Sequence, residues 1–177
     1  MDNKEFNDSS ALENQLTKTS KPRKNEYCEG SQYTFDDLYV TPFKQKRVYD
    51  PDGNISYVPI ERNLHPTGID VLDEFLLGMS SGEMGTYKKY GFSTHNIHNI
   101  LFVLTGIQGV QFVNKWRVKV AMDLLRYTDL AMPEVANYSA MGTTSNLFYF
   151  MQREAKTSPL RYRHWVREKG DLGRFKL

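Results

Sequence analysis

The chain has very little cysteine, since Cys28 is the only one among its 177 residues. A single cysteine excludes a disulfide within the chain, and a zinc site would need histidines or carboxylates from scattered positions. Long apolar runs are also missing. No window approaches the roughly 18 uninterrupted apolar residues of a membrane span, and Met1 to Glu5 do not lead into the apolar stretch of a signal peptide. These absences favour a reducing compartment, and we expect a cytoplasmic protein.

Acidic residues are scarce in the second half of the chain, although the formal net charge is only +2. Residues 85–177 hold 14 Lys+Arg against 6 Asp+Glu, a net of +8, whereas residues 1–84 hold 9 against 15, a net of −6. A basic block of this size attracts polyanions, and an acidic neighbour can screen it or compete for it. Solubility alone would also explain the pattern, so the motifs must decide.

The N-terminal third carries little apolar periodicity. Residues 1–33 are polar and unpatterned, which predicts a disordered tail. In residues 34–66, β-formers at 46–49 and 55–58 flank a Pro/Asp/Gly turn, which predicts a short hairpin in an otherwise irregular segment. Two strands alone are marginal in water, so the hairpin must dock on the rest of the chain or remain loose.

From Thr67 onward the apolar residues repeat at helical spacing, which predicts an all-α domain over residues 67–170 and a tail at 171–177. Ser93 and Ser158 are expected N-caps, and Gly106 is an expected helix end. Gly85 weakens the second helix of the series. Trp116 and Trp165 fall at helical spacing and are expected to be core residues or anchors between helices. The expected helices are 69–77, 83–90, 94–104, 109–127, 132–138, 143–154 and 160–169.

Two pairs of these helices have the proportions of a helix-turn-helix. Residues 132–138 form a short helix that is followed by a tight turn and by a longer helix with small polar residues at its start. Residues 83–90 and 94–104 repeat the arrangement. In this motif the second helix lies in the major groove, where its first residues meet base edges. The pattern therefore predicts two helix-turn-helix subdomains that share the long helix 109–127.

Over about 100 residues, from Gly68 to Lys169, the chain resembles the DNA-binding domain of the AraC/XylS family of bacterial transcriptional regulators. The first unit matches the family's S-x-x-x-L-x-x-x-F pattern and its following glycine at Ser93, Ile97, Leu101 and Gly106. The second unit matches R-x-x-x-A-x-x-L-L … E-I-A … S-P-x-x-Y-R at Arg117, Ala121, Leu124, Leu125, Leu130, Glu134, Val135, Ala136, Leu147, Pro159, Tyr162 and Arg163.

The chain departs from the family at several positions. Ala140-Met141 replaces Gly-Phe in the second turn, Lys156 replaces the glycine before Ser-Pro, and Met151 replaces a phenylalanine. We expect Met to fill the aromatic slot and Gly142 to adopt the left-handed conformation. Tyr149 stands where many members carry a base-reading arginine, and tyrosine cannot make the bidentate contact to guanine.

The resemblance implies two sets of DNA contacts. Asparagine can pair with adenine, hydroxyls with either strand, and a threonine methyl with thymine, so base contacts are expected from polar residues of both recognition helices. These residues are His95, His98 and Asn99 on the first and Thr144, Ser145 and Tyr149 on the second. Phosphate contacts are expected from flanking cations. These are Lys88, Lys89, Lys115, Arg153, Arg161 and Arg163.

The sequence therefore predicts a transcriptional regulator and not an enzyme, because it has no nucleophile elbow or phosphate-binding loop. His95 and His98 are spaced to chelate a metal, but no third ligand accompanies them. Expected partners are double-stranded DNA and RNA polymerase or another protein, with no cofactor and no membrane contact. The usual ligand-binding barrel of the family does not fit in about 65 residues, so no small-molecule effector is expected.

An interaction or adaptor protein that keeps the helix-turn-helix fold without sequence-specific DNA binding is the alternative. The weak helix with Gly85, Tyr149 in place of arginine and the acidic first half favour it.

Overall fold

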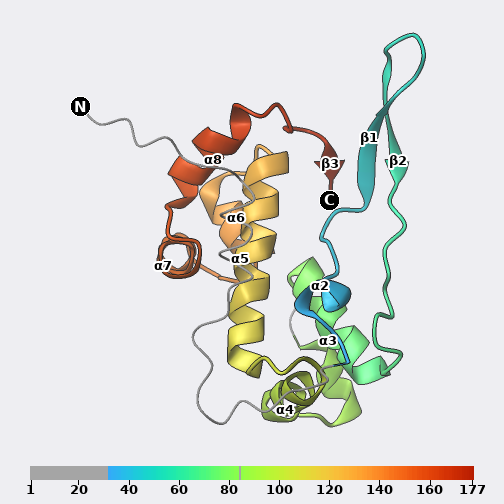
Figure 1. The fold of residues 1–177 in the computed structure, drawn as a ribbon, viewed down its shortest axis with the longest axis vertical. Coiled ribbons are helices and arrows are strands. Elements are labelled where there is room, and N and C mark those ends of the chain that lie inside the picture. The colour runs from blue at the N-terminus through green and yellow to red at the C-terminus, as the bar shows by residue number, and fades with distance from the viewer. Residues whose placement is uncertain (1–31, 84) are drawn as a thin grey trace.

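The computed structural model describes residues 32–83 and 85–177 (Figure 1), so the predicted disordered tail lies almost entirely outside the described residues. The described chain is mainly helical and has a small three-stranded sheet of order β2-β1-β3. None of its helices combines the length and the apolar character needed to cross a membrane. The elements are α2 (Phe35–Leu38), β1 (Gln45–Tyr49), β2 (Ile55–Pro59), α3 (Asp70–Ser81), the 3-10 helix η1 (Thr86–Tyr90), α4 (Thr94–Thr105), α5 (Gly109–Tyr127), α6 (Met132–Tyr138), α7 (Thr144–Glu154), α8 (Pro159–Arg167) and β3 (Phe175–Lys176).

The long helix α5 is the centre of the core, and its bounds are those predicted from its apolar stripe. α4 packs against it at the end where α5 begins, and α6, α7 and α8 pack along the rest (Figure 1). Trp116 is 1% exposed, as its spacing predicted. Burying apolar side chains on several faces of one helix contributes about 25 cal/mol per Å² of apolar surface, so α5 carries much of the folding free energy.

Hydroxyl side chains cap α4, α7 and α8, and the caps of α4 and α8 are those that the sequence predicted. Ser93 accepts a hydrogen bond from the Asn96 N–H, while the Asn96 side chain accepts one from the Ser93 N–H, which completes a capping box. Thr143 caps α7, and Ser158 caps α8 ahead of a proline in the first turn. Each such cap stabilises its helix by about 1 kcal/mol.

The stretch predicted as a helix at 83–90 is shorter and tighter than expected. Gly85 adopts φ 112°, in a region that favours glycine, and η1 begins only after it. Tyr87 anchors this 3-10 helix, because it is 3% exposed and its hydroxyl shares a 2.7 Å hydrogen bond with Thr94. The predicted α-helix is thus replaced by one short turn that is fastened to the start of α4.

The predicted hairpin is present, and it docks through a strand that the sequence did not predict. β3 pairs antiparallel with β1, so the last residues of the chain complete the sheet. Phe175 packs against both Phe43 and Tyr127, with ring centroids 5.4 Å and 4.8 Å away. Arg126 binds Asp171 with an N–O distance of 2.6 Å. These contacts fasten the sheet to the end of α5.

The segment before the hairpin runs along α5 and covers its aromatic side chains. Phe35 packs against Phe112 and Trp116, and Tyr39 packs against Trp116, with centroid distances from 4.9 to 6.1 Å. This segment, residues 33–43, is called the N-terminal brace below. It buries the aromatic stripe of α5 on the side away from α7 (Figure 1).

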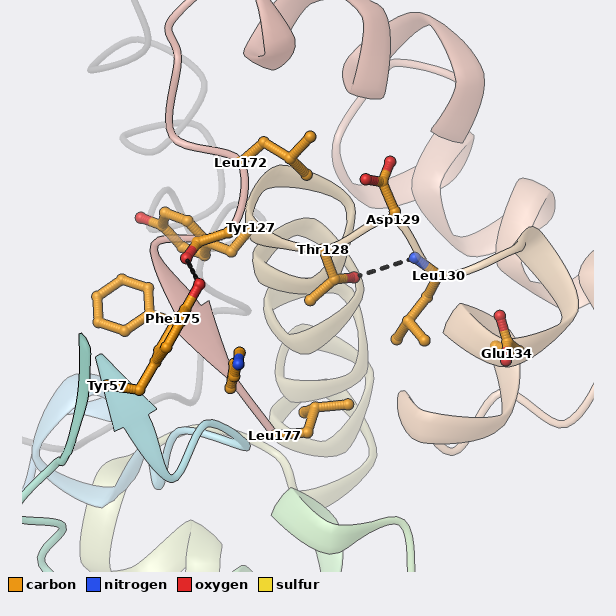
Figure 2. Close-up of a pocket in the computed structure, with 11 residues that line it drawn as sticks. Tyr57, Tyr127, Thr128, Asp129, Leu130, Glu134, Leu172, Phe175 and Leu177 are labelled. Carbon is orange, nitrogen blue, oxygen red and sulfur yellow. Dashed lines mark hydrogen bonds between the residues drawn. The ribbon is translucent and has the colours of Figure 1, made fainter. Parts of the chain in front are cut away.

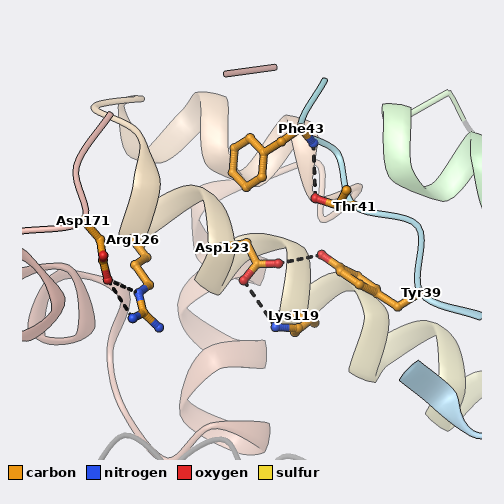
Figure 3. Close-up of polar contacts among 7 residues, drawn as sticks. All are labelled: Tyr39, Thr41, Phe43, Lys119, Asp123, Arg126 and Asp171. Atoms are coloured by element: carbon orange, nitrogen blue, oxygen red, sulfur yellow. Dashed lines mark hydrogen bonds and ion pairs between the residues drawn. The ribbon is translucent and has the colours of Figure 1, made fainter. Parts of the chain in front are cut away.

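A polar cluster ties the brace to α5 (Figure 3). The Tyr39 hydroxyl donates to Asp123 at 2.8 Å, and the Lys119 ammonium donates to the other oxygen of Asp123 at 3.4 Å. Burial raises the pKa of the Asp123 carboxyl, although Lys119 and the Tyr39 hydrogen bond oppose the shift. Burial and the neighbouring Asp123 also hold the pKa of the Tyr39 hydroxyl well above its usual range. Both shifts follow from the removal of the carboxylate and the phenol from water.

Candidate nucleic-acid interface

α4 turns its apolar residues to the core and exposes a polar face near its start. Ile97 and Leu101 are fully buried, while His95 and Asn99 are exposed and His98 is half-buried. The three predicted base-contacting residues therefore lie on one side of the helix. Phe102 continues this face at 36% exposure and was not predicted, because the motif fixes only the first turns of the helix.

His98 has a structural role besides its place on this face. A Cβ on Gly109 would lie 2.3 Å from the Cβ of His98, so α4 and α5 are in very close contact there. Burial, together with the neighbouring His95, lowers the pKa of the His98 imidazole, which therefore stays neutral at pH 7. A neutral imidazole offers one donor and one acceptor to a base edge rather than a charge.

α7 has the same organisation as α4. Leu147 and Met151 are fully buried, Ser145 is exposed, and Thr144 is half-buried. Tyr149 is 57% exposed. Gln152 is exposed seven residues after Ser145 and therefore shares its face. Its amide can pair with adenine, and its spacing from Ser145 could have revealed it from the sequence.

The turn between α6 and α7 adopts the left-handed backbone at two positions. Gly142 has φ 75°, as expected, but Ala140 has φ 54° as well, although alanine carries a Cβ. Lys156, before α8, has φ 55°. At both Ala140 and Lys156 the backbone therefore adopts a conformation that suits glycine better.

Met141 and Asn146 hold this turn in place. Met141 is 4% exposed, consistent with the expectation that it fills an aromatic slot. The Asn146 side chain donates to the Met141 carbonyl at 2.9 Å. The start of α7 is therefore fixed relative to α6 by a buried side chain and a hydrogen bond.

The predicted phosphate-contacting cations have different surroundings. Lys88 and Arg161 are exposed, whereas Lys89 pairs with Glu74 at 2.7 Å. Arg153 pairs with Glu154 and lies over the ring of Tyr149. The remaining two are engaged within the fold. Arg163 donates to the Leu130 carbonyl, and the Lys115 ammonium lies 4.3 Å from the ring centroid of Phe35 in the brace.

A cavity of about 380 Å³ lies between β2, β3 and the segment that leads from α5 to α6 (Figure 2). Its polar groups already serve the fold. Tyr57 donates to the Gly173 carbonyl, Asp129 pairs with Arg167, and Glu134 accepts from the Ala131 N–H. Within the described residues, no three His, Cys, Asp or Glu side chains gather in a way that could hold a metal ion. The polar faces of α4 and α7 therefore remain the best candidate site.

A comparison of the chain with known protein families, with curated proteins and with solved structures finds no match.

Proposed function

We propose that the protein is a DNA-binding transcriptional regulator with two helix-turn-helix units, of which α4 and α7 are the recognition helices. η1 and α4 form the first unit, α6 and α7 form the second, and α5 joins them. The observation that carries the proposal is that α4 and α7 both pack on α5 and both expose polar side chains near their capped starts. Two reading helices on one rigid connector can enter successive major-groove segments of a duplex.

Base reading falls mainly to uncharged polar side chains in this proposal. Asn99 on α4 and Gln152 on α7 carry amides that match the donor and acceptor pair of adenine. Ser145 and the exposed ring of Phe102 add a hydroxyl for either strand and an apolar surface for a thymine methyl. These side chains favour DNA sites that contain A·T pairs. An arginine would instead favour sites that contain guanine.

The left-handed turns give further support. Ala140 and Lys156 hold positive φ at the family's glycine positions, so the turn geometry of the family pattern is kept without its residues. The net charge of +8 over residues 85–177 supplies the attraction to the duplex.

Selection of bound sequences from random duplexes, followed by anisotropy titrations of the full chain at increasing salt, tests the proposal. We expect an enriched sequence, and we expect affinity to fall steeply with salt, because several phosphates release counterions. Lack of any retained duplex at low salt would contradict DNA binding. If duplexes are retained but no sequence is enriched, the protein binds DNA through charge alone.

The adaptor alternative has one observation in its favour. Val103 at the end of α4 is 73% exposed, and Val110 at the start of α5 is 59% exposed. The two valines lie on either side of the turn that joins α4 to α5, and exposed apolar side chains at a surface can mark protein contacts. If the selection and the salt titration detect no DNA binding, this surface becomes the leading candidate site.

A further inference from the structure

Arg117 on α5 differs from the other arginines of residues 32–83 and 85–177 because its guanidinium has no partner. Its Nε is buried without a hydrogen bond. Other arginines of these segments are engaged: Arg126 with Asp171, Arg163 with the Leu130 carbonyl, and Arg167 with Asp129. Burial lowers the pKa of Arg117, yet arginine remains cationic at any physiological pH. An unpaired, half-buried cation is costly to a fold, and binding an anion from outside the fold would offset this cost.

The position of Arg117 on α5 points to the source of that anion. Residues seven apart on a helix lie nearly in line, so Val110, Arg117 and Leu124 form one stripe. Val110 is 59% exposed and Leu124 is fully buried, which places Arg117 where the solvent-exposed part of this stripe ends. α4 packs at the beginning of α5, and α7 and α8 pack further along (Figure 1). Arg117 therefore lies near the middle of α5, the helix that joins the two candidate reading units.

We propose that Arg117 grips a backbone phosphate of the duplex between the two major-groove segments that α4 and α7 enter. This inference rests on the proposed function, since it names a phosphate site within the same interface. A guanidinium suits this role because its planar fork can donate two parallel hydrogen bonds to phosphate oxygens. Its stem is held by the fold, so little side-chain freedom is lost on binding. The contact positions both reading helices at once and carries no base preference.

The test compares Arg117→Met with Lys46→Met in the full chain. Each variant removes one positive charge, but Lys46 is exposed on β1, away from α4 and α7 (Figure 1). Binding to a random-sequence duplex is followed by anisotropy from low to physiological salt. For Arg117→Met we expect the slope of log affinity against log salt to fall by about 0.9, and affinity at 0.1 M salt to fall about eightfold. Lys46→Met should keep the wild-type slope, and Arg117→Lys should recover most of it.

Thermal unfolding without DNA separates a binding role from a structural one. An unpartnered cation contributes nothing favourable to the free fold, so Arg117→Met should unfold at the wild-type temperature or higher. If Arg117→Met unfolds at a lower temperature than the wild type, and its loss of DNA affinity is in proportion to its loss of stability, then Arg117 has a structural role. That result would overturn the inference. A wild-type salt slope in Arg117→Met would overturn it while leaving DNA binding intact. If the wild-type protein itself retains no duplex at low salt, the proposed function fails and this inference fails with it.

Discussion

The side chain of His98 lies directly over the backbone of Gly109, where a Cβ would be 2.3 Å from the histidine Cβ. The Cβ of His98 belongs to the first half of α4, and Gly109 is the first residue of α5. A side chain at position 109 would therefore push the two helices apart. Because residue 109 has no side chain, α4 can pack closely against the start of α5. This contact sets the position of α4 relative to the connecting helix.

Gly109→Ala should destabilise the protein by about 1–3 kcal/mol, because the clash involves backbone-near atoms that cannot rotate away. The higher helix propensity of alanine offsets at most about 1 kcal/mol of that loss. Chemical denaturation measures the change, with Gln111→Ala, at an exposed position two residues later, as the control. Equal stability of Gly109→Ala and wild type would mean that α4 and α5 are not in this close contact.

Glycine at Ala140 or Lys156 should stabilise the fold. Both residues adopt positive φ, which costs a residue with a Cβ about 1 kcal/mol or more relative to glycine. We expect Ala140→Gly and Lys156→Gly each to raise the free energy of unfolding by about 0.5–1 kcal/mol after the entropy of the unfolded chain is included. Gln152→Gly, at an exposed helical position, should lower it by about 1 kcal/mol. Denaturation midpoints that fall in all three variants would exclude left-handed turns at residues 140 and 156.

Asp123 should make stability depend on pH. Burial raises the pKa of its carboxyl in the folded state, so the folded protein binds a proton more tightly than the unfolded chain. Its contribution to stability is therefore greatest below the unfolded pKa of about 3.9 and declines as pH rises toward the folded pKa. Asp123→Asn, which cannot ionise, should lack this decline.

The measurement is the difference in unfolding free energy between wild type and Asp123→Asn across this pH range. Tyr39→Phe serves as a control, because it removes the hydroxyl that donates to Asp123 but leaves the carboxyl in place. A difference that does not change with pH would show that the carboxyl is ionised in the fold as readily as in water.

The helices could be predicted from the sequence because their determinants are local. α5 follows from one apolar stripe, and the starts of α4 and α8 follow from Ser93 and Ser158. β3 could not be predicted in this way, since it is two residues long and its partner β1 lies more than a hundred residues earlier. The failure at 83–90 has a local cause, since Gly85 permits both a helix and the turn that forms.

The candidate site was predicted less completely than the fold. Helical spacing placed His95 and Asn99 on an exposed face, but it could not show that His98 also packs on Gly109. Arg117 matched a sequence pattern, but the sequence gave no sign of a function for it. A missing hydrogen-bond partner can be recognised only in the three-dimensional structure, where the neighbouring residues are placed. Lys115 is two residues away and equally basic, yet it is held by the brace.

Loss of the amides at Asn99 and Gln152 should weaken binding to the selected sequence and leave binding to random duplexes nearly unchanged. Both side chains are exposed on the polar faces of α4 and α7, and each amide can make a bidentate contact worth about 1–3 kcal/mol of discrimination. Asn99→Ala and Gln152→Ala should therefore each lower affinity for the selected duplex by about five- to 150-fold. Their salt slopes should match wild type, because neither side chain neutralises a phosphate.

Ser56→Ala is the matched control, since Ser56 is an exposed polar residue on β2, away from both helices (Figure 1). Paired titrations against the selected duplex and a scrambled duplex give the discrimination directly. Equal affinity of Asn99→Ala, Gln152→Ala and wild type for the selected duplex, with discrimination retained, would remove α4 and α7 as reading helices. An equal loss on both duplexes would instead assign the two amides to backbone contacts, because a phosphate contact weakens every sequence alike.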